Sequence, residues 1–159
     1  MFLFLFLLGT AVGSFLNVLI DRLPNEESIH GRSHCNHCRR TLRWFELIPL
    51  FSFLFLQGKC RTCKKPIPLV YFFVELLTGV MFVAVWNYLS VSPVMLNLFQ
   101  HLPWKILNQV QDDTIKIVYL VISSCLVAIF FTDAKYQIIP DSIQLVLFLS
   151  IFVLFLLLG

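Results

Sequence analysis

The sequence predicts an all-α integral membrane protein with about four transmembrane helices and a small cytoplasmic insert between the first two. Of its 159 residues, 58% are hydrophobic and only 13% are charged, and the mean hydropathy is +0.84. A water-soluble domain of this length could not bury so much apolar surface. Nine of the twelve lysines and arginines lie between Arg22 and Lys65. Such a cluster between two apolar runs sets orientation in a bilayer, so we expect a lipid environment and no nucleic-acid partner.

Residues 1–20 form the first predicted transmembrane helix, because this uncharged run is long enough to cross a bilayer. A cleaved signal peptide is the alternative, but the run lacks a basic start and ends in charged residues instead of a cleavage site. Gly9, Gly13 and Ser14 place small groups three or four residues apart, which allows another helix to approach closely. Asn17 lies within the apolar run and needs a partner inside the bundle.

Residues 21–68 form a predicted cytoplasmic domain that contains two Cys-x-x-Cys pairs. The four cysteines are Cys35, Cys38, Cys60 and Cys63. A two-residue gap lets both thiolates of a pair reach one ion, and four sulfurs complete a tetrahedral structural zinc site, a zinc knuckle. Two disulfides or free thiols are the alternative, and the compartment decides between them. His34 and His37 could replace a thiolate, although solvated histidines are the simpler interpretation.

Within this domain, residues 44–56 (WFELIPLFSFLFL) are strongly apolar, yet they are too few to span a bilayer and are interrupted by Pro49. One interpretation is a segment that lies on the membrane face, or dips into it, beside the cysteines. The other is a small hydrophobic core for the cysteine domain.

Residues 69–159 form a predicted transmembrane region with three more spans, which are 69–89, 115–131 and 142–159. Residues 90–114 are expected to form a polar connection, and residues 133–141 (DAKYQIIPD) a short turn. The lone Cys125 is expected to be a buried apolar side chain.

Glu75 lies about two turns inside the second span, where an ionisable group is costly unless it is paired or faces water. It is therefore a candidate functional residue. The alternative is a structural hydrogen bond to Asn17 or Thr78.

The orientation follows from the positive-inside rule. The insert carries nine basic residues, whereas the connection at 90–114 carries only Lys105, so the insert is expected to be cytoplasmic and the amino terminus outside. The turn at 133–141 then returns to the cytoplasmic side, together with Asp133. A reducing compartment favours a metal over disulfides for the four cysteines.

The acids near the membrane surface are the candidates for chemistry, because the sequence has no nucleophile elbow, P-loop or H-E-x-x-H motif. They are Asp133, Asp141 and Glu75. Hydrolysis of a peptide by carboxylates needs two of them sharing a proton. A single aspartate at a helix end is more often a cap, so these residues alone define only a membrane protein with a cytoplasmic zinc knuckle.

Three stretches together resemble the bacterial prepilin peptidases, also called type IV leader peptidases. The first is GSFLNV at 13–18 continuing to DRLP at 21–24. The second is the paired Cys-x-x-Cys knuckles followed by P-x-P, Tyr71 and VEL at 74–76, and the third is DAKYQIIPD at 133–141. The resemblance runs from about Gly9 to Asp141.

The resemblance implies an inner-membrane aspartic endopeptidase that cuts the basic leader from prepilins or type II secretion pseudopilins, after a Gly and before a Phe. Many members also methylate the new amino terminus with S-adenosylmethionine. Asp133 matches the first catalytic aspartate of the family. The four cysteines match its metal-binding cysteines.

The chain departs from the family at the second catalytic aspartate, which belongs to a G-x-G-D motif in a later span. None of the six glycines begins such a motif, and Asp141 matches the P-D of the first motif instead. We therefore expect a truncated form that is inactive unless another fragment supplies the missing acid. The alternative is a non-catalytic membrane module that binds prepilins or the assembly proteins of pili or type II secretion.

Overall fold

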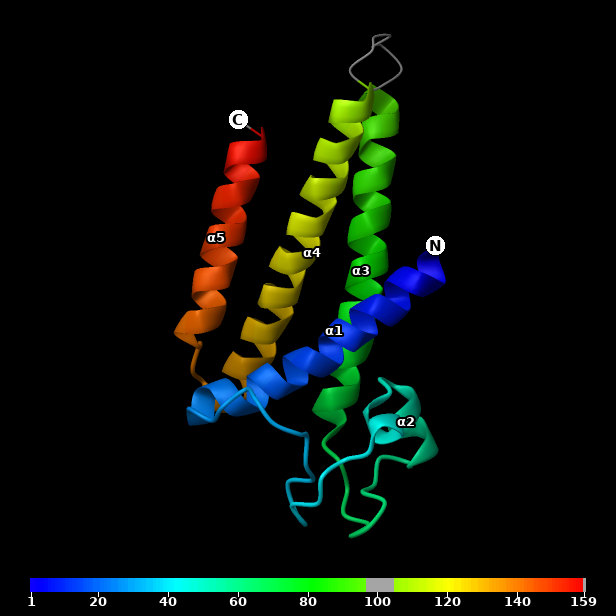
Figure 1. The fold of residues 1–159 in the computed structure, drawn as a ribbon, viewed down its shortest axis with the longest axis vertical. Coiled ribbons are helices and arrows are strands. Elements are labelled where there is room, and N and C mark those ends of the chain that lie inside the picture. Colours follow the sequence, from blue (N-terminus) through cyan, green and yellow to red (C-terminus); the bar gives the residue numbers. More distant parts are fainter. Residues whose placement is uncertain (97–104, 159) are drawn as a thin grey trace.

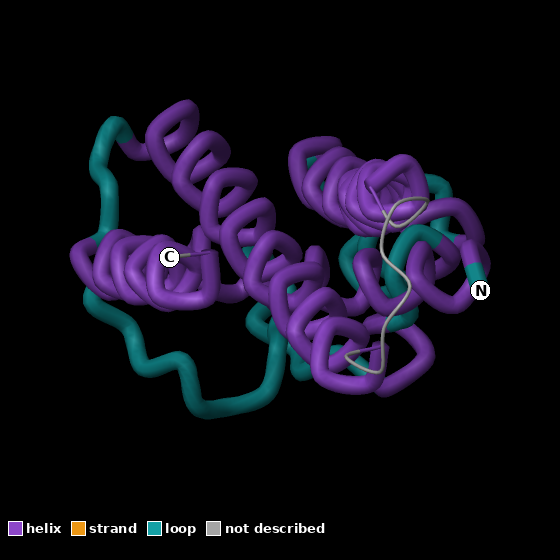
Figure 2. The backbone as a smooth tube through the Cα atoms, turned by 90° about the horizontal axis from the view of Figure 1, so that it is seen from above, coloured by secondary structure: helices purple, strands orange, loops and turns teal. Residues whose placement is uncertain are grey.

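The computed structural model describes residues 1–96 and 105–158, and they are almost entirely helical. The helices are α1 (Phe2–Arg22), α2 (Phe51–Phe55), α3 (Leu69–Leu96), α4 (Lys105–Tyr136) and α5 (Asp141–Leu158), with short 3₁₀ turns η1 (Leu23–Asn25) and η2 (Trp44–Leu47). Figure 2 shows helices joined by loops and no strand in the part of the chain described. The all-α class predicted from the sequence is confirmed.

Four of the described helices are long and apolar enough to cross a membrane. Their candidate spans are Phe2–Asn25, Leu69–Ser90, Asp112–Tyr136 and Asp141–Leu158. In Figure 1, α3, α4 and α5 run alongside one another, and α1 crosses them obliquely. Helix α1 contacts α3 and α4, α3 contacts α4, and α4 contacts α5. The insert with α2 lies at the end of the bundle where α1 finishes and where α4 turns into α5.

Helices α1 and α3 approach each other so closely that glycine is required on α1. A Cβ atom at Gly13 would lie 2.7 Å from the Cα atom of Glu75, and one at Gly9 would lie 2.8 Å from the Cα atom of Gly79. Across the same contact, the Nδ2 of Asn17 donates a hydrogen bond to the Tyr71 carbonyl at 3.1 Å. Both predictions for this helix are confirmed, since the small residues face another helix and Asn17 has a partner inside the bundle.

The buried apolar core lies where the four long helices meet. Its members are Leu16, Ile20, Val74, Cys125, Val127, Ala128 and Ile143. Cys125 is buried, as expected for an apolar side chain.

The predicted polar connection at 90–114 is wrong over most of its length. Helix α3 continues to Leu96 and α4 begins at Lys105, while residues 97–104 lie outside the described residues. Hydropathy locates the part of a helix that matches the bilayer, but the helical hydrogen bonds continue through polar residues. An ion pair between Lys116 and Asp113, one turn apart at 3.3 Å, supports the polar part of α4.

The turn before α5 is also shorter than predicted. Helix α4 continues through Tyr136, so Asp133 lies in its last turn and only residues 137–140 connect it to α5. The N–H of Gln137, which has a φ of 55°, donates to the Asp133 carbonyl at 2.8 Å and closes the helix.

Replacing Gly13 with alanine is expected to destabilise the fold by about 1–3 kcal/mol, because the added methyl group overpacks against the backbone of α3. The measurement is the free energy of unfolding in detergent micelles. Ala84→Val adds more atoms on an exposed part of the same helix pair and is the matched control, with little expected change. Equal stability of the Gly13→Ala variant and the wild type would contradict the tight α1–α3 contact.

Candidate metal centre and the adjoining cavity

The two Cys-x-x-Cys pairs fold into the same local backbone. The N–H of Cys35 donates to the Arg40 carbonyl at 3.0 Å, and the N–H of Cys60 donates to the Lys65 carbonyl at 2.9 Å. The residue after the second cysteine has a positive φ in both, 54° in the first pair and 58° in the second. One isolated bridge closes each pair, His34 to Thr41 and Lys59 to Pro66. The sequence therefore builds two equivalent knuckles.

The knuckles bring all four cysteines together. Their Sγ atoms lie within 4.8 Å of one another, and the Sγ atoms of Cys35 and Cys63 are 3.9 Å apart. A tetrahedral zinc ion with bonds of about 2.3 Å to sulfur places its ligands about 3.8 Å apart. The cluster therefore fits one metal ion. His34 and His37 are not among its members, and both line the cavity beside it.

Backbone amides favour the thiolate at one of the four cysteines. The N–H groups of Cys63 and Thr62 lower the pKa of Cys60 to about 6, despite the opposing effect of burial. At Cys63 the N–H of Lys65 acts in the same sense, but burial and the neighbouring sulfurs outweigh it and raise the pKa to about 11. The backbone therefore favours the thiolate at Cys60, which is the form that binds a metal, and a bound ion would displace the protons of the other thiols.

A buried carboxylate ties the first knuckle to η2. The side chain of Glu46 is only 2% exposed, and its Oε1 accepts from the Nη2 of Arg40 at 2.6 Å. Its Oε2 accepts from the N–H of Arg43 at 2.8 Å. Burial acts to raise the pKa of Glu46, but these two donors outweigh it and hold the pKa below its usual value. The role of Glu46 is not apparent from the sequence, because the residue lies inside an apolar run.

The apolar segment around Glu46 does not form a core for the insert. Within residues 23–68 only Glu46 and Cys60 are buried. Trp44 is 78% exposed and Phe55 is 82% exposed. The interpretation of residues 44–56 as the hydrophobic core of the cysteine domain is wrong.

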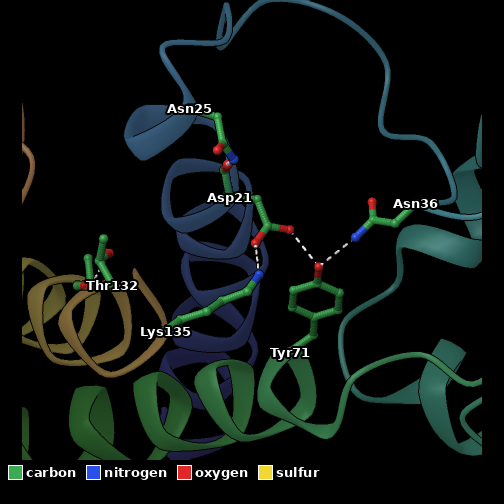
Figure 3. Close-up of polar contacts among 7 residues, drawn as sticks. Asp21, Asn25, Asn36, Tyr71, Thr132 and Lys135 are labelled. Carbon is green, nitrogen blue, oxygen red and sulfur yellow. Dashed lines mark hydrogen bonds and ion pairs between the residues drawn. The ribbon is translucent and has the colours of Figure 1, made fainter. Parts of the chain in front are cut away.

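A polar network joins three helices to the first knuckle (Figure 3). Asp21, in the last turn of α1, accepts from the hydroxyl of Tyr71 on α3 and pairs with the Nζ of Lys135 on α4, both at 2.5 Å. The Tyr71 oxygen also accepts from the Nδ2 of Asn36, between the first two cysteines, at 3.0 Å. Sequence reasoning did not find this network, because its members are up to 114 residues apart.

A cavity of about 510 Å³ lies between this network, the knuckles and α2. Its lining includes Asn17, Asp21, Cys60, Glu75 and Lys135. It therefore adjoins the metal cluster on one side and the helix bundle on the other.

Glu75 makes a structural hydrogen bond, but with a partner that was not expected. Its Oε2 accepts from the N–H of Leu50 at 2.8 Å, at the start of α2. Asn17 donates instead to Tyr71, and the hydroxyl of Thr78 donates to the Val74 carbonyl at 2.7 Å. The predicted partners of Glu75 were wrong, because the segment that reaches it comes from the insert.

The two aspartates of the last motif lie on either side of the turn at 137–140. Asp133 is exposed in the last turn of α4, and Asp141 is exposed at the first residue of α5. Neither lines the cavity. Lys135 lies two residues after Asp133, and its ion pair with Asp21 fixes the end of α4 to the end of α1. The catalytic role of Asp133 stays a prediction.

Fold and site together define a multi-pass helical membrane protein with a four-cysteine module at one end. The family model that matches is the bacterial peptidase A24 N-terminal domain, over residues 7–89. The chain belongs to the prepilin leader peptidase family.

Its relatives include prepilin leader peptidase/N-methyltransferases from several bacteria. The chain is 36% identical to that of Klebsiella pneumoniae over 149 residues, which are 89% of this chain and 56% of the relative. It is 35% identical to that of Bacillus subtilis over 140 residues, 87% of this chain and 48% of the relative. With that of Myxococcus xanthus it shares 48% identity over 99 residues, 58% of this chain and 30% of the relative. The chain thus spans about half the length of these relatives or less. No solved structure matches it.

Purified protein is expected to contain about one metal ion per chain, and the Cys35→Ser/Cys38→Ser variant to lose it, because two sulfurs cannot complete the site. Elemental mass spectrometry of the purified protein measures this. Cys125→Ser is the matched control and should keep the metal, since Cys125 lies in the helical core. Equal metal content in the wild type and both variants would show that the four cysteines do not hold the metal.

The ion pair between Asp21 and Lys135 is expected to contribute a coupling energy of about 1 kcal/mol, because both side chains are partly buried, 27% and 34% exposed. A double-mutant cycle with Asp21→Asn and Lys135→Met measures it through the free energy of unfolding. The pair Lys116–Asp113, nearer the start of α4, is the control; it joins residues one turn apart on the same helix and should give only a few tenths of a kcal/mol. A smaller coupling for Asp21–Lys135 than for the control pair would contradict its structural role.

Proposed function

We propose that the chain takes part in the processing of prepilin or pseudopilin leaders and supplies Asp133 as one of two catalytic carboxylates of an aspartic endopeptidase. The observation that carries this proposal is the position of Asp133 in the last turn of α4. It lies at the same end of the bundle as the cysteine module, held there by the Asp21–Lys135 pair. The names of the relatives supply the substrate class, a prepilin leader.

The proposal includes an orientation in the bacterial inner membrane. Nine basic residues in the insert favour its cytoplasmic side, and the residues of the Asp133 turn would lie on that side too. Residues 1–20 would be the first span, 21–68 the cytoplasmic domain and 69–159 the remaining transmembrane region. In a reducing compartment the four thiolates would hold zinc.

The zinc ion would be structural. Four sulfurs fill a tetrahedral zinc ion and leave no position for water or substrate, so the ion stabilises the shape of the insert and does no chemistry. The methyl donor S-adenosylmethionine stays a prediction from the N-methyltransferase names of the relatives, and we assign no residue of the chain to it.

Peptide hydrolysis by aspartates divides the work between two groups. One carboxylate takes a proton from the attacking water, and the other, protonated, donates to the carbonyl oxygen of the scissile bond. Asp133 is exposed and close to the membrane end of α4, where the start of a substrate's apolar segment would enter the bilayer. The 159 residues contain no G-x-G-D motif, so the second carboxylate would come from another polypeptide segment.

The cavity supports a second candidate function, binding of a prepilin or an assembly protein without cleavage. It lies between the knuckles and the spans, and Asp133 is not part of its lining. Co-purification of a prepilin with the chain, without processing, would favour this function.

Membranes that contain the chain alone are expected to leave a prepilin uncut, and co-expression of the remaining carboxyl-terminal part of the Klebsiella pneumoniae relative is expected to restore cleavage. Asp133→Asn should then abolish cleavage, because its amide cannot exchange the proton. Asp141→Asn, on the other side of the turn, is the matched control and should keep it. Gel analysis of leader removal measures the result. Unchanged cleavage by the Asp133→Asn variant would exclude Asp133 from the mechanism, and cleavage by the chain alone would contradict the need for a second segment.

A further inference from the structure

Helix α2 presents two different faces. Phe51, Leu54 and Phe55, spaced as one helical face, are 51%, 63% and 82% exposed. The residues between and after them, Ser52, Phe53 and Leu56, line the cavity. The outer face is therefore apolar and exposed, whereas the inner face lines the cavity.

Two contacts fix the depth of α2 against the bundle. The N–H of Leu50 donates to Glu75, and the rings of Phe53 and Phe72 lie 5.4 Å apart between centroids. The candidate span of α3 begins at Leu69, so Glu75 lies about 9 Å inside it at 1.5 Å per residue. Leu50 and Phe53 of this segment thus contact the first turns of a candidate membrane span.

Exposed apolar side chains also lie along the start of that span. Phe72 contacts Phe73, which is 52% exposed, and Leu69 and Leu77 are 61% and 40% exposed. Exposed basic side chains flank the apolar segment on both sides, Arg43 before it and Lys59 after it. Apolar side chains bordered by lysine and arginine suit the acyl region of a bilayer bordered by anionic headgroups.

We propose that residues 44–55 are a membrane anchor, which lies in the interface of a bilayer containing anionic lipid. Phe51, Leu54 and Phe55 enter the acyl region, with Trp44 at the headgroup level. This proposal is independent of the peptidase function.

The anchor also fixes the height of the cysteine module. A Cβ atom at Gly58, which has a φ of 65°, would lie 2.9 Å from the Phe53 ring, so the chain leaving α2 is packed directly on it. Cys60 follows two residues later and is buried. A displacement of α2 would therefore move the second knuckle, and lipid contact holds the metal site beside the membrane.

Quenching of Trp44 fluorescence in vesicles tests the anchor. The full chain with Trp86→Phe and Trp104→Phe keeps Trp44 as its only tryptophan, and is placed in vesicles of phosphatidylethanolamine and phosphatidylglycerol. Lipids brominated near the headgroup end of the acyl chain should quench Trp44 several-fold more than aqueous acrylamide does. In the control, Trp44→Phe and His30→Trp place the single tryptophan in the exposed loop before the knuckles, and the order of the two quenchers should reverse.

A further variant tests the exposed face itself. Phe55→Asp adds a charge on a side chain that makes little contact with the protein, so the variant should fold and keep its metal while losing most of the lipid quenching of Trp44. Equal quenching of Trp44 and of the His30→Trp control by acrylamide would overturn the proposal. Protection of Trp44 that appears only at high protein-to-lipid ratio would also overturn it, because that result assigns the face to a second copy of the chain.

Discussion

The close contact between α1 and α3 determines where the polar groups of the site can meet. Along α1, positions 9, 13, 17 and 21 fall on one face, four residues apart. They face successive turns of α3 in the opposite direction, with Gly9 against Gly79, Gly13 against Glu75 and Asn17 against Tyr71. Lipid provides no hydrophobic drive for helix association, so small residues that let backbones approach are what such a contact needs. The same register brings Asp21 to the hydroxyl of Tyr71.

At the end of this contact, electrostatics joins the third helix. A carboxylate at a helix carboxyl terminus is unfavourable by itself, because the helix dipole is negative there. Asp21 occupies such a position on α1, and Lys135 occupies the corresponding position on α4, where a cation is favourable. Their ion pair therefore satisfies both helix ends and fixes the turn that carries Asp133 to the start of the insert.

The sequence predicted what depends on short spacing and on composition. The four spans follow from apolar runs, and the knuckles follow from two Cys-x-x-Cys pairs, because two residues are the gap that one ion can bridge. The pairs Lys135–Asp21 and Leu50–Glu75 were not predictable in this way. Each joins segments far apart in the chain, and their meeting depends on the α1–α3 register and on the path of the insert. The helical ends of α3 and α4 beyond the bilayer were missed because hydropathy does not report on backbone hydrogen bonds.

The insert must be stabilised by something other than a core. Between residues 23 and 68 the only buried side chains are Glu46 and Cys60, and a unit of this size without a core depends on a metal or on its surroundings. The two ends of the insert are already fixed, because α1 and α3 are in contact. A metal ion bound by the four cysteines would divide the long loop between these helices into shorter closed loops. The free energy of metal binding then becomes free energy of folding. Glu46 holds the first knuckle and Glu75 holds the segment before the second, so the metal has only to join two parts that the carboxylates already position.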